Sequence, residues 1–354
     1  MFGANRFKLS SLLKIGMSSI CLVFVLASCG SAPVPVAAPR AAQPEWTSGG
    51  LHDRYNSHMF LTAVGHGNTR QAAEMDAFRQ LVTIFGVDVQ ADARHAEAYR
   101  SIGAISRHEV EFGSEIVLGA GMDNLIGARI GERWDDGRGS HFALATLNRA
   151  EATRIYSEMI RANQELIANL TTFASPAERN TLGGFSRYQF AAVIADMNAS
   201  YAAVLSAVGS PQHAQGLRTG DDFRREMQGI ANAIPIGINV NNDRAGRLQG
   251  AFAAAFTEFG FRTGGTNPRY VLNVNVVLQP TEHSGRNVFA RMELTANLVD
   301  TVTGAVLLPY TFNIREGHTI QSEAENRTFI SAERRINDEY REMLSDYLSQ
   351  LLPR

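Results

Sequence analysis

Three consecutive segments near the carboxyl end of this chain alternate apolar and polar side chains with the period of a β-strand. They run from Tyr270 to Leu278, from Ala290 to Leu298 and from Val306 to Ile314. The run from Asp300 to Gly304 is rich in turn residues and separates the last two segments, which predicts a meander. Pro309 has no backbone N–H, so it predicts an edge position or a bulge in the third strand.

Helical patterns and one more strand surround this meander. Residues 234–240 predict a strand, and Asp221 and Asp222 can cap a helix before it. A helix ending at Gly260 follows the strand. The last predicted element is a long helix with one stripe formed by Ile336, Tyr340, Met343, Tyr347 and either Gln350 or Leu351. The order β-α-β-β-β-α over residues 221–354 predicts an antiparallel sheet with helices on one face. In topology alone it resembles small α+β modules of envelope proteins, such as the amino-terminal domain of the TolB protein.

Residues 151–220 carry two apolar stripes at alternating steps of three and four residues, which predicts a pair of packed helices. The stripes consist of Ile155, Met159, Ala162, Leu166, Asn169 and Phe173, and of Phe190, Ile194, Met197, Tyr201, Val204 and Val208. Each lasts only two to three heptads, so packing within the chain is favoured over a coiled-coil surface for a partner. The segment is predicted as a helical hairpin or connector.

Residues 46–150 predict a small α+β domain. An apolar strand is predicted from Met59 to Val64, and Gly65-x-Gly67 follows it. A helix is predicted next, with a capping box formed by Asn68 and Gln71 at its start. Glycines at this place can admit a phosphate to a helix N-terminus, but no third glycine and no Gly-Lys-Ser/Thr follows, so a tight turn is favoured. Strands are further predicted over residues 115–118, 125–134 and 141–147, with a hairpin at Asp135-Asp136-Gly137 rather than a calcium site.

Several short motifs of this region resemble the LPP-twenty lipoprotein family over residues 44–155. They are Pro44-Glu45-Trp46, Tyr55, Val64-Gly65-His66-Gly67, Ala72-Ala73, Asp76-Ala77-Phe78-Arg79-Gln80-Leu81 and the strand Phe142 to Arg149. The resemblance implies a small α+β domain on a cell-envelope lipoprotein. It implies no catalytic residue.

The amino terminus predicts export and lipidation. Arg6, Lys8 and Lys14 precede an apolar run from Ile15 to Leu26, which is too short to span a bilayer and fits a signal peptide over residues 1–28. The next residues, Ala27-Ser28-Cys29-Gly30, complete a stretch that looks like the lipobox of bacterial lipoproteins. This resemblance implies cleavage before Cys29, acylation of its thiol, and outer-membrane sorting because Gly30 stands where an aspartate would retain the protein.

The composition of the chain that remains after cleavage limits its possible disulfides and binding partners. Of two cysteines, Cys21 lies in the leader, so Cys29 is the one thiol left and no intramolecular disulfide can form. Residues 29–45 contain four prolines and predict an extended tether, in which the stretch from Ser31 to Pro44 reaches at most roughly 45 Å. Three of the 33 basic residues precede Cys29, so the chain after cleavage has 30 basic and 35 acidic residues and a net charge of −5. This negative charge argues against nucleic acid as a binding partner.

Arg315, Glu316 and His318 form the most conspicuous polar cluster and are the candidate surface site. An enzyme would use His318 as a base that Glu316 orients. No serine or cysteine nucleophile lies in a recognisable elbow, and the nine histidines include no pair at metal-ligand spacing. The favoured interpretation is therefore structural: the cluster marks the end of a strand and the start of a helix, held by the pair of Arg315 and Glu316. No catalytic residue, metal or cofactor is predicted.

The predicted fold class is α+β, with two small domains of antiparallel sheets and packed helices joined by a helical segment. Three classes of function stay open. A non-catalytic outer-membrane lipoprotein, on the periplasmic face or the cell surface, would bind an envelope protein or peptidoglycan and is favoured. The second class is a hydrolase that acts on cell wall or lipid. The third is a subunit of a secretion or flagellar assembly, and homo-oligomerisation stays open with it.

Overall fold

The computed structural model describes residues 42–50, 52–85 and 125–351, and all the elements below belong to one unit, Gln43–Arg354. The leader, Cys29, most of the tether and the strand predicted over residues 115–118 lie outside the described residues. The short elements are a 3-10 helix at Glu45–Ser48, a second at Pro211–Ala214 and α5 at Pro176–Arg179. The described strands and longer helices are β1 (Phe60–Gly67), α1 (Arg70–Thr83), β2 (Ala128–Asp135), β3 (His141–Asn148), α4 (Arg149–Thr171), α6 (Leu182–Ala207), α7 (Gly220–Ala233), β4 (Ile236–Asn241), α8 (Arg247–Glu258), β5 (Tyr270–Ser284), β6 (Asn287–Asp300), β7 (Ala305–His318), α9 (Gln321–Arg335) and α10 (Arg341–Gln350).

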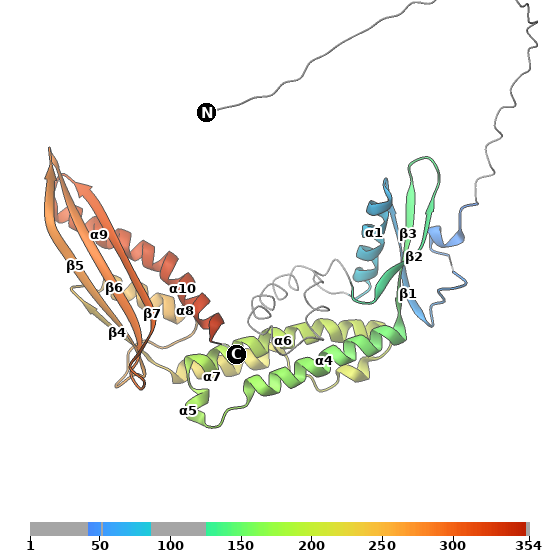
Figure 1. The fold of residues 1–354 in the computed structure, drawn as a ribbon, viewed down its shortest axis with the longest axis horizontal. Helices are drawn as coiled ribbons and strands as arrows, with labels where there is room; N and C mark the ends of the chain where they lie inside the picture. Colours follow the sequence, from blue (N-terminus) through green and yellow to red (C-terminus); the bar gives the residue numbers. More distant parts are fainter. Residues whose placement is uncertain (1–41, 51, 86–124, 352–354) are drawn as a thin grey trace, which may run out of the picture. The chain divides into compact units, whose positions relative to one another are not determined.

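Three antiparallel strands in the order β1-β3-β2 make the first sheet, and α1 covers one of its faces (Figure 1). The predicted hairpin at residues 135–139 joins β2 to β3. The predicted cap of α1 was wrong by one residue, because the side chain of Thr69, not that of Asn68, accepts the N–H of Ala72. The buried stripe of α1 is Ala73, Ala77 and Leu81, whereas Met75 is 56% exposed.

The segment before β1 covers the opposite face of this sheet. Trp46 is 6% exposed and lies in the short helix that contacts β1 and β3. The hydroxyl of Tyr55 donates to the carbonyl of Gly131, where a bulge interrupts β2. The sheet is therefore sandwiched between α1 and the chain that leads into it.

The predicted helix pair is α4 and α6, which pack along each other and share a hydrogen bond between the buried carboxamides of Asn163 and Asn198. On α6 the predicted stripe is confirmed, with Tyr201 half-buried and the other members buried. On α4 it was wrong, because Ala162 and Asn169 are exposed. The buried positions of α4 are Ala152, Tyr156, Ile160, Asn163 and Leu170, since the helix also packs against the first sheet at its amino end.

Helix α6 is, among the described residues, the one helix long and apolar enough to cross a membrane, and half of its most apolar window is buried. Its residues enter all three hydrophobic clusters, with Val204 and Leu205 beside the first sheet and Leu182 and Phe185 beside the second. Packing within the chain therefore accounts for its apolar composition. Helix α7 follows and begins with a capping box between Thr219 and Asp222, so its N-cap lies two residues before Asp221.

The second sheet has the order β4-β5-β6-β7, and its helices α8, α9 and α10 lie on one face, as predicted (Figure 1). The α+β class is confirmed. One pairing differs from the expected antiparallel sheet: β4 runs parallel to β5. The reason is that α8 carries the chain back across the face, so β5 restarts in the direction of β4. Pro309 lies in the edge strand β7 beside a bulge between Leu298 and Val299, as its missing N–H requires.

The carboxyl-terminal helix differs from the predicted stripe because a π turn at Ile336–Tyr340 separates α9 from α10. The buried positions Ala324, Thr328, Ala332, Ile336, Tyr340, Leu344 and Leu348 follow one another at steps of four. Such a stripe drifts around a regular α-helix of 3.6 residues per turn. The wider π turn compensates for part of that drift and keeps the stripe on the sheet.

Candidate functional site

The face of the second sheet that points away from the helices is rich in polar side chains. Strand side chains alternate between faces, and the inner positions of β5, β6 and β7 are buried under α8, α9 and α10. Val271, Val277, Val299 and Pro309 share this face. Its polar positions carry Asn239, Asn241, Asn273, Asn275, Gln279, Arg291, Glu293, Thr295, Asn297, Thr311, Asn313 and Arg315. We call this set the polar face.

Strand register gathers the asparagines of the polar face into rows. Asn239, Asn273 and Asn297 are direct neighbours across β4, β5 and β6, and the amide of Asn239 donates to the carbonyl oxygen of Asn273 at 3.2 Å. The next row consists of Asn241, Asn275, Thr295 and Thr311. Pro309 on β7 continues the first row, and no charged side chain belongs to either row.

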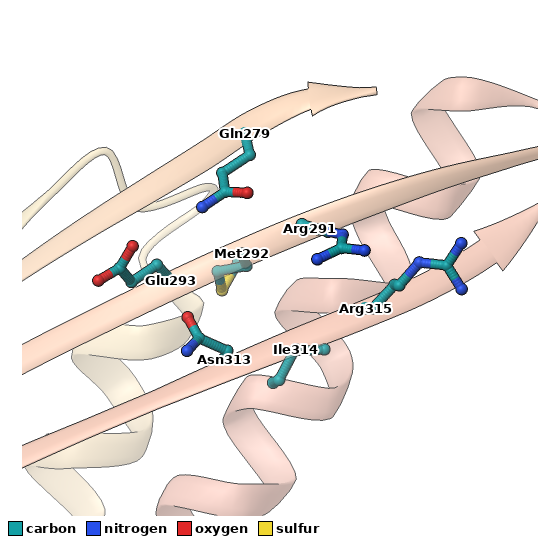
Figure 2. A pocket seen from close by; sticks show the side chains of 7 residues that line it. All are labelled: Gln279, Arg291, Met292, Glu293, Asn313, Ile314 and Arg315. Carbon is teal, nitrogen blue, oxygen red and sulfur yellow. The ribbon is translucent and has the colours of Figure 1, made fainter. Parts of the chain in front are cut away.

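A hollow of about 280 Å³ lies farther along the same face and is lined by residues of three strands. Figure 2 shows Gln279 on β5, Arg291 and Glu293 on β6, and Asn313 and Arg315 on β7 around it. The side chains of Met292 and Ile314 point to the inner face of the sheet, so these two residues form the floor of the hollow and add no polar group to it. The hollow therefore continues the polar face with longer side chains.

Charges at the hollow are paired. The carboxylate of Glu282 accepts Arg291 Nε at 2.9 Å and lies 3.3 Å from an Nη of Arg315. The guanidinium of Arg315 also lies over the ring of Phe289, 3.7 Å from its centroid. The hollow thus has two cationic side chains, Arg291 and Arg315, and two carboxylates, Glu282 and Glu293, so this end of the polar face is locally neutral.

The structure separates the three residues of the predicted site. Arg315 lines the hollow on the outer face, whereas Glu316 alternates inward and accepts the hydroxyl of Ser331 on α9 at 2.7 Å. His318 ends β7, and its Nδ1 accepts the backbone N–H of Ile320. Glu316 thus contacts Ser331 and not His318, and Arg315 pairs with Glu282 rather than Glu316.

The other motifs considered from sequence have local structural roles. Gly65 and Gly67 lie in β1 directly beneath α1, where a Cβ on Gly65 would stand 2.0 Å from the Ala77 nitrogen. Helix backbone therefore fills the space that a phosphate would need. Asp136 accepts the backbone N–H groups of Arg138 and Ser140, and these hydrogen bonds lower its pKa. The described residues contain no group of acidic, histidine or cysteine side chains that could hold a metal ion.

A second polar cluster joins the helices. Arg179 and Arg218 both pair with the Glu226 carboxylate, and Arg179 Nε also lies 3.4 Å from the hydroxyl of Tyr188. Burial acts to raise the pKa of Glu226, but hydrogen bonds from Tyr188 and Arg218 hold it below its usual value. Tyr188 is 5% exposed and packs among core residues. This cluster stabilises the contact of α5, α6 and α7.

Sequence reasoning found Arg315 but missed the rest of the polar face. The signal was present in the positions between the apolar residues, where Asn273 and Asn275 alternate with Leu272, Val274 and Val276.

No family model and no curated protein matches this chain. Among solved structures, a minor lipoprotein from Acinetobacter baumannii is similar with 17% identity and a TM-score of 0.25, over 34% of this chain and 94% of the other. A secreted protein from Helicobacter pylori matches with 11% identity and a TM-score of 0.37, over 79% of this chain and 98% of its own. A lipoprotein from Neisseria meningitidis matches with 16% identity and a TM-score of 0.21, over 28% and 93%.

Proposed function

We propose that this chain is a lipid-anchored lipoprotein of the cell envelope whose folded body binds another envelope component without catalysing a reaction. The observation that carries the proposal is the sequence Leu26-Ala27-Ser28-Cys29 behind a basic and apolar leader. Two or more acyl chains, palmitate among them, would hold Cys29 in a bilayer because each buried methylene contributes about 0.8 kcal/mol. The prolines of residues 29–45 would hold the body away from the headgroups.

The proposal includes a finer placement. Gly30 favours the outer membrane, and the motifs of residues 44–155 favour an LPP-twenty-like domain there. The partner would be an envelope protein or peptidoglycan, met on the periplasmic face or at the cell surface. Protease treatment of intact cells distinguishes the two orientations, because a periplasmic body is protected until the outer membrane is permeabilised.

The polar face supports binding over catalysis. His318 and Glu316 have separate local partners, so the acid–base pair of a hydrolase is not assembled. Substituting His318→Ala is expected to leave the cellular role intact. A phenotype equal to that of a deletion would contradict the non-catalytic assignment.

Metabolic labelling with an alkyne analogue of palmitate tests the anchor. The wild-type chain and a Cys21→Ala variant are expected to take up label and to fractionate with membranes. A Cys29→Ala variant is expected to take up no label, because it lacks the thiol that carries the acyl chains. Label on Cys29→Ala, or none on the wild type, would overturn the proposal.

A further inference from the structure

The polar face differs from an ordinary protein-docking surface. The buried centre of a protein–protein interface is enriched in aromatic and apolar side chains. Here the two central rows offer Asn and Thr with one proline, Pro309, and the next row toward the hollow holds one exposed valine, Val277. Asn239, Asn241, Asn273 and Asn275 are exposed. Burying these carboxamides against another protein would cost desolvation with little apolar area to offset it. A protein partner is therefore disfavoured.

Charge narrows the ligand class further. The asparagine rows carry no charge, and at the hollow Arg291 and Arg315 are paired with Glu282. An anionic or cationic polymer would meet no opposite net charge on this surface, so electrostatic attraction would contribute little. The ligand that fits is polar and neutral.

Carboxamides suit one kind of neutral polar ligand particularly well. Each Asn or Gln offers two donors and an acceptor, which matches a hydroxyl or an acetamido group that also donates and accepts. Within the part of the chain that the structure describes, the side-chain amides of Asn275, Asn297 and Asn313 have no hydrogen-bond partner. Their capacity is available to a ligand.

The dimensions suit a chain rather than a single small molecule. From Asn273 to Gln279 β5 advances six residues, which is about 20 Å at the usual rise of a strand. Four strands at the usual separation give a width of about 14 Å. The apolar Val271 and Val299 form the row beside the asparagines and can contact sugar C–H faces or acetyl methyl groups.

We propose that the polar face binds a neutral glycan chain that carries N-acetyl groups. The asparagine rows hydrogen-bond its hydroxyl and acetamido groups, and the hollow at Gln279, Arg291 and Arg315 receives one sugar ring between planar polar side chains. This inference rests on the binding role proposed above, and it names the class of ligand. It does not depend on the anchor at Cys29.

The test is isothermal titration of the purified mature lipoprotein in detergent with tetra-N-acetylchitotetraose. The probe is expected to bind, and combined Asn273→Ala and Asn275→Ala substitutions are expected to weaken binding about tenfold through lost hydrogen bonds. Asn326→Ala is the matched control, because Asn326 is an exposed asparagine on α9 in the helical layer. An Asn275→Thr variant keeps strand propensity and is expected to weaken binding in the same direction. Unchanged unfolding midpoints show that each variant is folded.

Any of three results with the glycan probes or the variants would overturn the inference. They are no heat of binding with millimolar chitotetraose, binding that the polar-face variants leave unchanged, and equal binding of cellotetraose, which lacks the N-acetyl groups. Preferential binding of poly-L-glutamate would likewise refute a neutral ligand. Each result is independent of palmitate labelling at Cys29, so the failure of this inference and the failure of the anchor are distinguishable.

Discussion

Gly65→Ala is expected to destabilise the first sheet strongly, because Gly65 provides the closest approach between β1 and α1. An added Cβ would lie 2.0 Å from the Ala77 nitrogen and 2.3 Å from the Ala73 carbonyl oxygen, whereas ordinary contact begins at 3.4 Å. The helix backbone would have to retreat by about 1.4 Å along a line that backbone atoms now fill. That retreat would also loosen Leu81, which is 0% exposed. We expect a loss of about 3 kcal/mol or more in the free energy of unfolding.

The assay for Gly65→Ala is urea unfolding followed by tryptophan fluorescence. Both tryptophans, Trp46 and Trp134, lie in or against the first sheet, so the signal reports on the region that changes. Gly229→Ala is the control, since Gly229 is an exposed position of α7 with nothing within 4 Å of an added Cβ. It is expected to stabilise the helix by about 0.5–1 kcal/mol. An unfolding free energy of Gly65→Ala within about 0.5 kcal/mol of wild type would refute the close packing of α1 on β1.

Substitutions at three further residues test other parts of the fold. Arg187 donates to the carbonyls of Leu170, Asn169 and Thr172 at the end of α4. In urea unfolding, Arg187→Ala is expected to lower the free energy of unfolding by about 2–3 kcal/mol, and Arg187→Lys is expected to lower it by most of that amount. A Lys variant as stable as wild type would contradict the role of the planar guanidinium. The buried hydroxyl of Tyr340 has no hydrogen-bond partner among the described residues, so Tyr340→Phe is expected to raise stability by about 1 kcal/mol, and a loss of stability would argue that the hydroxyl is satisfied. The guanidinium of Arg269 donates to the carboxylate of Asp300, and this hydrogen bond lowers the pKa of Asp300. The stability that Asp300 contributes is therefore complete above about pH 4, and it is lost as the pH falls through the lowered pKa. Unfolding free energies of wild type and Asp300→Asn should therefore converge below about pH 4, and a gap that stays constant with pH would exclude this linkage.

Local patterns predicted most elements because each pattern has a local cause. The alternation of Leu272, Val274 and Val276 matches a strand with one buried face, and Gly260 ends α8 with a positive φ of 85°. Where a second contact competes with the local pattern, the prediction was wrong. On α4 the first sheet and α6 both draw side chains inward, so its buried stripe includes Tyr156 and Ile160 rather than Ala162.

The glycines before α1 show the same limit at one residue. Their spacing indicates a turn or a phosphate loop, because sequence alone places them after the strand. In the structure they belong to β1, and Gly65 pairs with Ala143 on β3. Small side chains at Ala73 and Ala77 complete the contact from the helix. The need for glycine is therefore set by a residue twelve positions farther along the chain.

The polar face depends on pairing direction in a way that no single segment reveals. Asn239 is beside Asn273 only because β4 runs parallel to β5 in this register; a shift of one residue would turn the β4 asparagines to the other face. The antiparallel β5–β6 register then places Asn297 beside Asn273, and the same register sets Arg291 beside Gln279. Each asparagine taken separately is an ordinary exposed strand residue. Their meeting in rows requires the crossover through α8, and a chain that placed β4 elsewhere would keep every local pattern and lose the site.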